Sequence, residues 1–149
     1  MSLSTDRFFF KALTSDSNVA AAVGTRIANP ALTYEQEDKW SLPYLVIMLE
    51  GVVNQPETKD ERGESDDDTA TVSILCVAST RDALSALTET VRTAVRDAYR
   101  EEQDWDAMGF EIKDYQFSAE NVQLDPDKPC VFQTLRYACD VQNLELIWE

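Results

Sequence analysis

Residues 69–100 read TATVSILCVASTRDALSALTETVRTAVRDAYR and carry the main fold signal of the chain. Residues 69–77 alternate small polar with apolar side chains and are rich in β-branched residues, a pattern typical of a strand. Ser79 or Thr80 can cap a following helix, and Asp82 then lies in its first turn, where a negative charge suits the helix dipole. Apolar residues recur at helical spacing after this cap, so we expect a long helix packed on a sheet. The apolar stripe comprises Leu84, Leu87, Val91, Ala94, Val95 and Ala98.

An apolar run and an acidic loop precede this strand. Residues 43–49, PYLVIML, form a second strand pattern, so the two runs predict a β-hairpin. The loop between them, residues 55–68, contains seven acids against only Lys59 and Arg62. A loop of this composition forms no core, and we expect it to be solvated or neutralised by a partner. Its acids are Glu57, Asp60, Glu61, Glu64, Asp66, Asp67 and Asp68.

Short helices are predicted near the N-terminus. Ser4 or Thr5 can cap the first, whose buried face would carry Phe8, Phe9, Ala12 and Leu13. Residues 19–23 predict a second helix that ends at Gly24 in a left-handed cap. Residues 26–27 add a brief strand.

The C-terminal part predicts two further strands. Phe110, Ile112, Tyr115 and Phe117 change alternating face, which indicates a bulge near Asp114. Residues 125–129 form a strong turn signal, and residues 130–141 alternate clearly, with one face polar. Leu144, Leu146 and Trp148 take the other parity, which predicts a bulge or a separate short strand.

These patterns predict one α+β domain over residues 1–149, with an antiparallel or mixed sheet, a long helix on one face and short N-terminal helices. The composition is globular, with 44% hydrophobic residues, but the formal charge is −15. Such a charge opposes non-specific binding to nucleic acid or anionic membrane. Adaptation to high salt is an alternative explanation of the charge. The N-terminus lacks a secretory signal pattern and no apolar run could span a bilayer, so we expect a cytoplasmic protein.

The residues that most enzyme sites need are missing from the sequence. The chain has no histidine, no phosphate-cradling glycine motif and no C-x-x-C pair, so we expect no catalytic residue, no cofactor and no metal. Asp66, Asp67 and Asp68 lack the spacing of a calcium loop. Three cysteines, Cys76, Cys130 and Cys139, lie in strand patterns and are expected to be reduced and buried.

Two sequence features suggest contacts between subunits. Arg92, Arg96 and Arg100 recur at every fourth position on the exposed face of the long helix. Neighbouring acids, Glu89, Glu101 and Glu102, could neutralise them, or acids of another subunit could. The apolar residues Leu144, Leu146, Ile147 and Trp148 could close the domain's own sheet or dock on a neighbour.

Residues 12–27, ALTSDSNVAAAVGTRI, followed by residues 42–47, LPYLVI, and by residues 69–95, resemble the tail-completion proteins of long-tailed bacteriophages. These proteins are also called tail terminators or tail-to-head joining proteins. The resemblance covers about residues 8–100 and depends mainly on the order of the elements. The acidic loop departs from the family pattern, and residues 104–128 match no part of it.

The resemblance implies a ring, typically a hexamer, that caps the completed tail tube and presents the surface to which the filled head attaches. The implied partners are further copies of the chain, the tail tube protein and a head-neck connector protein. The implied location is the tail–head junction of the virion, with assembly in the host cytoplasm. The family contributes no catalytic residues.

DNA would pass through such a ring without being specifically bound. Carboxylates facing the lumen would repel its phosphates, over a distance of about 8 Å at physiological salt. We therefore expect part of the acidic loop to face the lumen or an adjoining ring. Two other interpretations remain open: a binding module that takes a basic protein on its acidic loop, and a neck adaptor on the head side.

Overall fold

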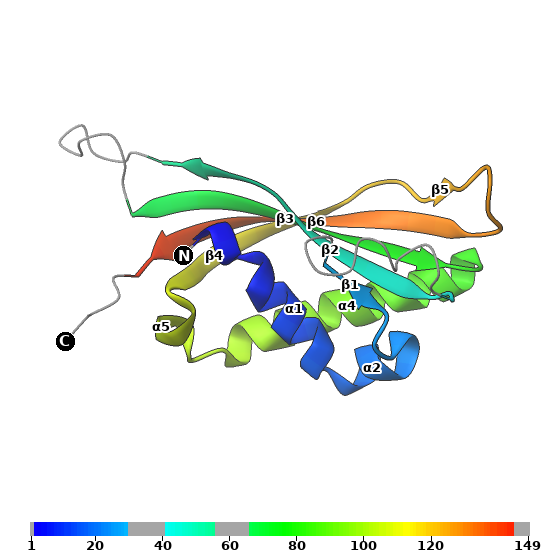
Figure 1. Cartoon of the computed structure of the whole chain (residues 1–149), viewed down its shortest axis with the longest axis horizontal. Helices are drawn as coiled ribbons and strands as arrows, with labels where there is room; N and C mark the ends of the chain where they lie inside the picture. The colour runs from blue at the N-terminus through cyan, green and yellow to red at the C-terminus, as the bar shows by residue number, and fades with distance from the viewer. Residues whose placement is uncertain (1, 30–40, 56–65, 145–149) are drawn as a thin grey trace.

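The computed structural model describes residues 2–29, 41–55 and 66–144. Groups of helices and groups of strands follow one another along the chain, and the helices lie below the sheet in the view of Figure 1. In chain order the elements are η1 (Ser2–Ser4), α1 (Asp6–Ser15), α2 (Ser17–Val23), β1 (Ile27–Ala28), β2 (Tyr44–Asn54), β3 (Asp67–Ala78), α4 (Arg81–Glu101), α5 (Trp105–Met108), β4 (Phe110–Ala119), β5 (Gln123–Leu124) and β6 (Val131–Asn143).

The strands form one mixed sheet in the order β1-β2-β3-β6-β4, with β5 also paired to β6. Only β1 and β2 run parallel, and the other pairs are antiparallel. The predicted α+β fold class, with a long helix and short N-terminal helices on a sheet, is therefore confirmed. All the large helices pack against one face, so the opposite face of the sheet carries no described helix (Figure 1).

The predicted hairpin is present, and both of its strands are longer than the sequence indicated. β2 continues to Asn54, past a register shift between Leu49 and Gly51. β3 begins at Asp67, so Asp67 and Asp68 belong to a strand, and the prediction that they lie in the loop was wrong. Their backbones pair with β2 and β6, which extends the ladder into the acidic stretch.

The long helix agrees closely with its prediction. The Thr80 hydroxyl accepts a hydrogen bond from Ala83 N at 3.1 Å and caps α4. The predicted apolar stripe is buried from Leu84 to Val95, and Ala98 is half-buried. Burying this stripe against the sheet stabilises the helix more than its intrinsic propensity does.

The structure of the N-terminal helices differs from the prediction in three respects. Thr5 precedes α1, but its side chain makes no capping hydrogen bond to the helix. Asp16 caps α2 by accepting from Asn18 N at 2.9 Å and Val19 N at 3.0 Å, so α2 begins earlier than predicted. Gly24 ends it with a positive φ of 60°, but its ψ of −125° lies outside the left-handed helical region that was predicted. Phe8, Phe9, Ala12 and Leu13 form the buried face of α1, as expected.

The C-terminal strands confirm the predicted bulge and the predicted polar face. The register of β4 against β6 shifts between Ile112 and Asp114. Alternate residues of β6, from Leu135 to Val141, are buried in the core, and Arg136 points the other way. The core holds a cluster of aromatic rings around Tyr137, which contacts Phe9, Tyr115 and Phe117 at centroid distances of 5.1–5.4 Å.

Candidate functional site

The base of the acidic loop is a hydrogen-bonded junction of three strands. The Asp68 side chain, 7% exposed, accepts from Asn54 Nδ2 of β2 and from Asn143 Nδ2 of β6, both at 2.7 Å. The Asn143 amide also donates to the Asp66 carbonyl at 3.3 Å. The Asp68 carboxylate thus links the ends of β2, β3 and β6, whereas the Asp66 side chain is exposed. Four of the predicted loop acids, Glu57, Asp60, Glu61 and Glu64, lie outside the described residues.

The three arginines of the predicted stripe on α4 are exposed, as expected, but they have different surroundings. The Arg92 guanidinium lies 4.1 Å above the Phe117 ring of β4, in cation–π contact. Arg96 Nε lies 3.9 Å from Asp97 Oδ1, with both side chains about half exposed. Within the described part of the chain, Arg100 has no ion-pair partner. The stripe therefore contributes two peripheral cations, Arg96 and Arg100, and one residue that packs on the sheet.

The acids expected to neutralise this stripe do not do so. Glu102 pairs instead with Lys11 of α1 at 3.2 Å. Glu89 and Glu101 form no ion pair with any residue that the structure describes. Within the described residues, none of these three acids forms an ion pair with the stripe.

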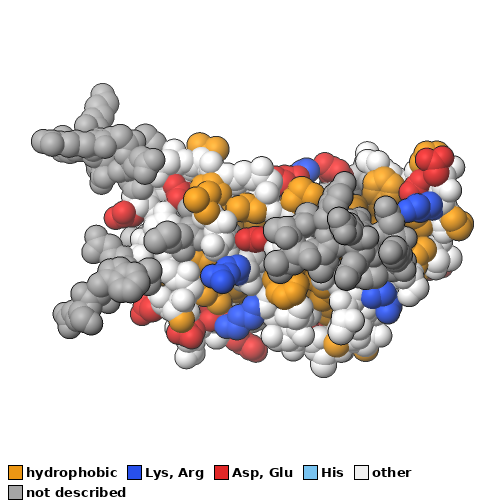
Figure 2. Space-filling view, in the orientation of Figure 1, with side chains coloured by type: hydrophobic (Ala, Val, Ile, Leu, Met, Phe, Trp, Pro, Cys, Tyr) orange, Lys and Arg blue, Asp and Glu red, His pale blue; other side chains and the backbone are white. Residues whose placement is uncertain are grey.

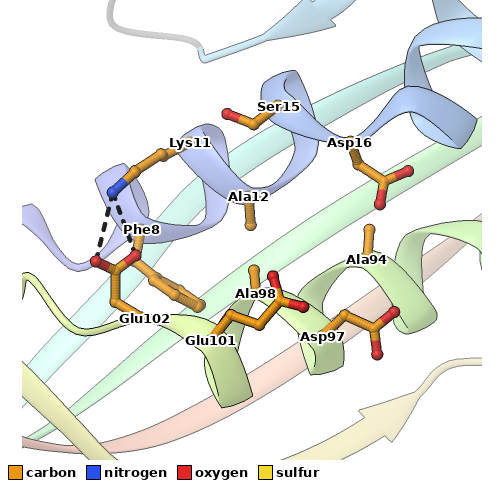
Figure 3. Close-up of a pocket in the computed structure, with 10 residues that line it drawn as sticks. All are labelled: Phe8, Lys11, Ala12, Ser15, Asp16, Ala94, Asp97, Ala98, Glu101 and Glu102. Atoms are coloured by element: carbon orange, nitrogen blue, oxygen red, sulfur yellow. Dashed lines mark hydrogen bonds and ion pairs between the residues drawn. The ribbon is translucent and has the colours of Figure 1, made fainter.

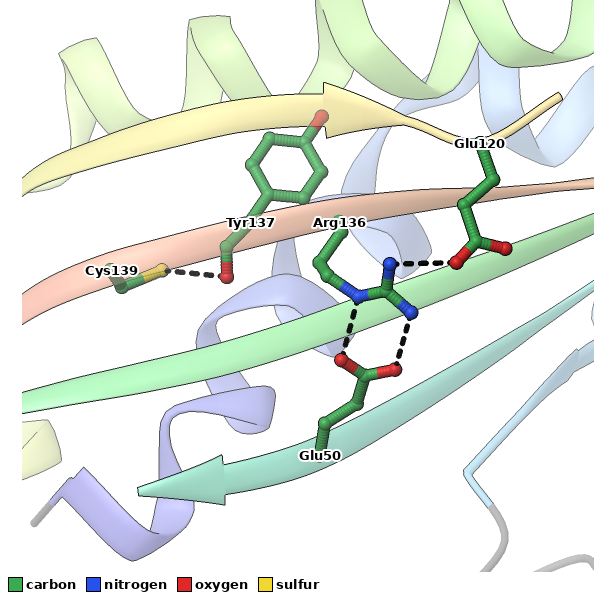
Figure 4. A network of polar contacts seen from close by, with 5 residues as sticks. All are labelled: Glu50, Glu120, Arg136, Tyr137 and Cys139. Atoms are coloured by element: carbon green, nitrogen blue, oxygen red, sulfur yellow. Dashed lines mark hydrogen bonds and ion pairs between the residues drawn. The ribbon is translucent and has the colours of Figure 1, made fainter. Parts of the chain in front are cut away.

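A polar cluster that was not predicted from the sequence lies on the face of the sheet opposite the helices. Arg136 of β6 donates to Glu50 of β2 from Nε at 2.7 Å and from Nη2 at 2.9 Å. Its Nη1 donates to Glu120, just beyond β4, at 2.8 Å. Figure 4 shows Arg136 and Tyr137 pointing to opposite sides of β6, so one strand supplies both the cluster and the core. The only sequence signal was the polar parity of β6.

The hydrogen bonds from Arg136 lower the pKa of Glu50, against a smaller opposing effect of burial. The same bonds raise the pKa of Arg136, so both groups stay charged at neutral pH. The cluster ties β2, β6 and the end of β4 together across β3. All three guanidinium nitrogens of Arg136 donate to the carboxylates of Glu50 and Glu120. The side chain therefore holds the strands together and does not form a free anion-binding site.

A groove of about 310 Å³ separates α1 from α4. Figure 3 shows Lys11 and Glu102 bridging it at one end, with Ala12, Ala94 and Ala98 forming its floor. Small floor residues let the two helices approach closely, and the acids Asp16, Asp97 and Glu101 lie along the rim. The groove holds no arrangement of nucleophile and base.

The predicted C-terminal contact residues are only partly described. Leu144 is half-buried, and its backbone N donates to the Gly109 carbonyl at 3.0 Å. This bond continues the pairing of β6 with the start of β4 by one residue. Leu146 and Trp148 lie outside the described residues.

The three cysteines are reduced and buried, as expected. Burial raises the pKa of Cys139 to about 12 and raises those of Cys76 and Cys130 as well, so the thiols stay protonated at neutral pH. No cluster of metal-ligating side chains occurs within residues 2–29, 41–55 and 66–144. None of the helices described there is long and apolar enough to cross a bilayer. Acidic, basic and apolar side chains are interspersed on the surface in Figure 2.

Comparison with known proteins supports a shared fold with a solved structure. No protein-family model and no curated protein matches the chain. A chain in a structure described as the virion of a native gene transfer agent particle aligns over 93% of this chain and 94% of its own length, with a TM-score of 0.56 and 15% identity. A protein from Akkermansia muciniphila aligns over 67% of this chain and 42% of its own, with 14% identity and a TM-score of 0.27, which supports no argument. The chain therefore shares its fold, over nearly its whole length, with that virion component.

Proposed function

We propose that this protein is a structural component of a phage-like virion. The observation that carries the proposal is the shared fold with a chain of the gene transfer agent virion, which covers both chains almost completely. The chemistry of the described residues is consistent with assembly, since the polar clusters are internally satisfied clamps and the thiols are buried.

Within that class, we propose that the protein is the tail terminator: a ring of six copies that caps the tail tube and joins it to the head. The order of elements over about residues 8–100 supports this assignment, because it resembles that of tail-completion proteins. The proposed partners are other copies of the chain, the tail tube protein and a head-neck connector protein. The proposed location is the tail–head junction, reached after assembly in the host cytoplasm.

The acidic loop has a proposed role in letting DNA pass. Six copies of a chain with a formal charge of −15 would surround the lumen with negative potential wherever their acids face it. The side chain of Asp68 is excluded from this role, because it is buried between Asn54 and Asn143. The candidate lumen-facing acids would therefore be Glu57, Asp60, Glu61, Glu64, the exposed Asp66 and the half-buried Asp67.

Electron microscopy of tails assembled with and without the protein tests the terminator assignment. We expect tubes of uncontrolled length that fail to join heads when the protein is missing. Tails of normal length that do not join would favour a neck adaptor on the head side. Normal, joined particles would overturn the proposal, and a protein that binds a basic partner through its acidic loop would then be the better interpretation.

A second experiment addresses the loop alone. Replacing Glu57, Asp60, Glu61 and Glu64 by serine removes charge without touching the Asp68 junction. We expect normal heads and tails but slower DNA ejection, because phosphates would no longer be repelled. A matched control replaces four exposed acids of the helical layer, Asp82, Glu89, Asp97 and Glu101, by serine. Equal ejection rates for both variants would reject the lumen role while leaving the terminator assignment intact.

A further inference from the structure

A second groove, of about 380 Å³, lies beside α1 on the side of α5. Its walls come from three parts of the chain: the outer face of α1, the residue after β1 and the end of α5. The groove combines apolar side chains with cations in a chain that is otherwise strongly acidic. The lining residues are Arg7, Phe10, Lys11, Asn29, Ala107 and Met108.

The cations of this groove are only partly used within the described structure. Lys11 Nζ forms an ion pair with Glu102 Oε2 at 3.2 Å, and the Lys11 side chain is 55% exposed. Arg7 is exposed and forms no ion pair with any residue of the described ranges. Phe10 and Met108 pack partly against the core and leave apolar surface toward the groove. An occupant with an apolar centre and acidic ends would complement this lining.

The chain supplies such a segment next to the groove. After Leu144 come five residues, Glu145, Leu146, Ile147, Trp148 and Glu149, in which three apolar side chains are flanked by two acids. The backbone N of Leu144 is bonded to the carbonyl of Gly109 at 3.0 Å, and Gly109 directly follows Met108 in the groove wall. Five residues can span up to about 17 Å, so the segment can reach the groove from this anchor.

We propose that residues 145–149 bind in this groove of their own subunit. The apolar side chains Leu146, Ile147 and Trp148 would cover Phe10 and Met108, and the flanking acids would lie near Arg7 and Lys11. The same subunit is favoured over a second copy because the anchor at Gly109 gives the tethered segment a high effective concentration at the groove. The inference does not depend on the virion assignment.

A cysteine pair tests where the segment binds. Ala107 is exposed in the groove wall, so Ala107→Cys combined with Ile147→Cys should form an intramolecular disulfide under mild oxidation, visible as a faster-migrating monomer without reductant. The control pair is Ser85→Cys with Ile147→Cys. Ser85 is exposed near the start of α4, about 24 Å along the helix from its end, and should not form the bond.

Mixing the two single variants, Ala107→Cys and Ile147→Cys, distinguishes the two possible sources of the segment. A disulfide-linked dimer in the mixture, without the intramolecular bond in the double variant, would show that a second copy fills the groove and would overturn the proposal. Equal cross-linking of the groove pair and the Ser85 control pair, or no cross-linking of either, would also overturn it.

A measurement without cysteines keeps the test independent of their effect on folding. Carboxypeptidase should remove residues 145–149 several-fold faster from the Arg7→Glu variant than from the unchanged chain, because repulsion of Glu145 and Glu149 would open the segment. Arg81→Glu, an exposed arginine at the start of α4, is the matched charge reversal and should leave the digestion rate unchanged. Equal rates for all three proteins would contradict binding in the groove.

Discussion

Arg136 on β6 and Glu50 on β2 are joined by two hydrogen bonds across the intervening strand β3, at 2.7 and 2.9 Å. Glu50 is the residue at which the register of β2 against β3 shifts between Leu49 and Gly51. A shift of this kind re-aims the side chain that it contains, and here it coincides with the carboxylate that meets Arg136. The clamp thus depends on a local irregularity in one strand and on the polar parity of another.

Removing the Glu50 charge should weaken the fold modestly. The two side chains are 31% and 34% exposed, so the variant Glu50→Gln is expected to lower the free energy of unfolding by about 1 kcal/mol or less. Urea denaturation at pH 7 measures this loss. Arg136→Lys keeps the charge but not the fork of two bonds, so its loss should be similar. If Glu50→Gln lowers the free energy of unfolding by about 1 kcal/mol and Arg136→Lys does not lower it, the charge of the pair, rather than its two-bond geometry, stabilises the fold.

The same pair predicts a dependence on pH. Because the folded-state pKa of Glu50 lies below its ordinary value of 4.5, its contribution is complete above 4.5 and disappears as pH falls through the lowered value. The stability difference between the unchanged chain and Glu50→Gln should therefore shrink only below pH 4.5. Urea titrations at a series of acidic pH values measure the difference. A gap that stays constant throughout this range would contradict the lowered pKa.

Asp68 and Asp66 should respond very differently to the same substitution. Asp68→Ala leaves the half-buried amides of Asn54 and Asn143 without their shared charged acceptor, at an expected cost of about 2–3 kcal/mol. Asp66→Ala removes an exposed carboxylate and should change stability by less than about 0.5 kcal/mol. Thermal or urea unfolding compares the two. Similar losses would mean that general charge repulsion, not the junction, determines the effect.

Within the arginine stripe, we expect Arg92 to affect the stability of the monomer, and Arg96 and Arg100 to affect assembly. Arg92→Glu should lower the free energy of unfolding, because it removes a cation–π contact with Phe117 worth about 0.5–1 kcal/mol. Arg96→Glu with Arg100→Glu should leave the stability of the monomer nearly unchanged, since both side chains lie at the periphery. If acids of a neighbouring subunit receive this stripe, the Arg96/Arg100 variant will form fewer rings in sedimentation or electron microscopy. Unchanged assembly would remove these arginines from the interface.

Local sequence rules were sufficient for most elements of this fold. The alternation in residues 69–77, the apolar spacing after Thr80 and the change of face near Asp114 each record a packing constraint within a few residues. Such signals survive because burial of one face acts on every second residue of a strand or on every third or fourth residue of a helix.

The polar clamps could not be predicted in the same way. Arg136 and Glu50 are 86 residues apart in the sequence. They meet only because the sheet places their strands, β6 and β2, on the two sides of β3. Local propensity predicts a loop at Asp68, because acids are rare in strands, whereas in the structure Asn54 and Asn143 from two other strands donate hydrogen bonds to its carboxylate. The pairing of distant strands, rather than local propensity, creates both sites.

Two tyrosines of the core predict opposite effects of the same change. Tyr137 Oη is buried and has no hydrogen-bond partner among the described residues, whereas Tyr99 Oη donates to the Lys113 carbonyl at 2.7 Å. Tyr137→Phe should therefore raise the free energy of unfolding by about 1 kcal/mol, because it removes a buried polar group that gains nothing from burial. Tyr99→Phe should lower it by about 1 kcal/mol, because it removes a formed hydrogen bond. Urea denaturation of both variants at pH 7 gives the comparison.

The aromatic contacts allow a controlled comparison of Tyr137→Phe with Tyr99→Phe. Both rings contact Tyr115, and substitution by phenylalanine preserves those contacts at 5.1 and 5.4 Å while deleting only the hydroxyl. A difference in sign between the two variants therefore reports hydrogen bonding rather than packing. If Tyr137→Phe instead destabilises the protein as much as Tyr99→Phe does, the Tyr137 hydroxyl must have a partner in solution. A buried water would be the natural candidate, because it can bridge an otherwise unsatisfied polar group in a core.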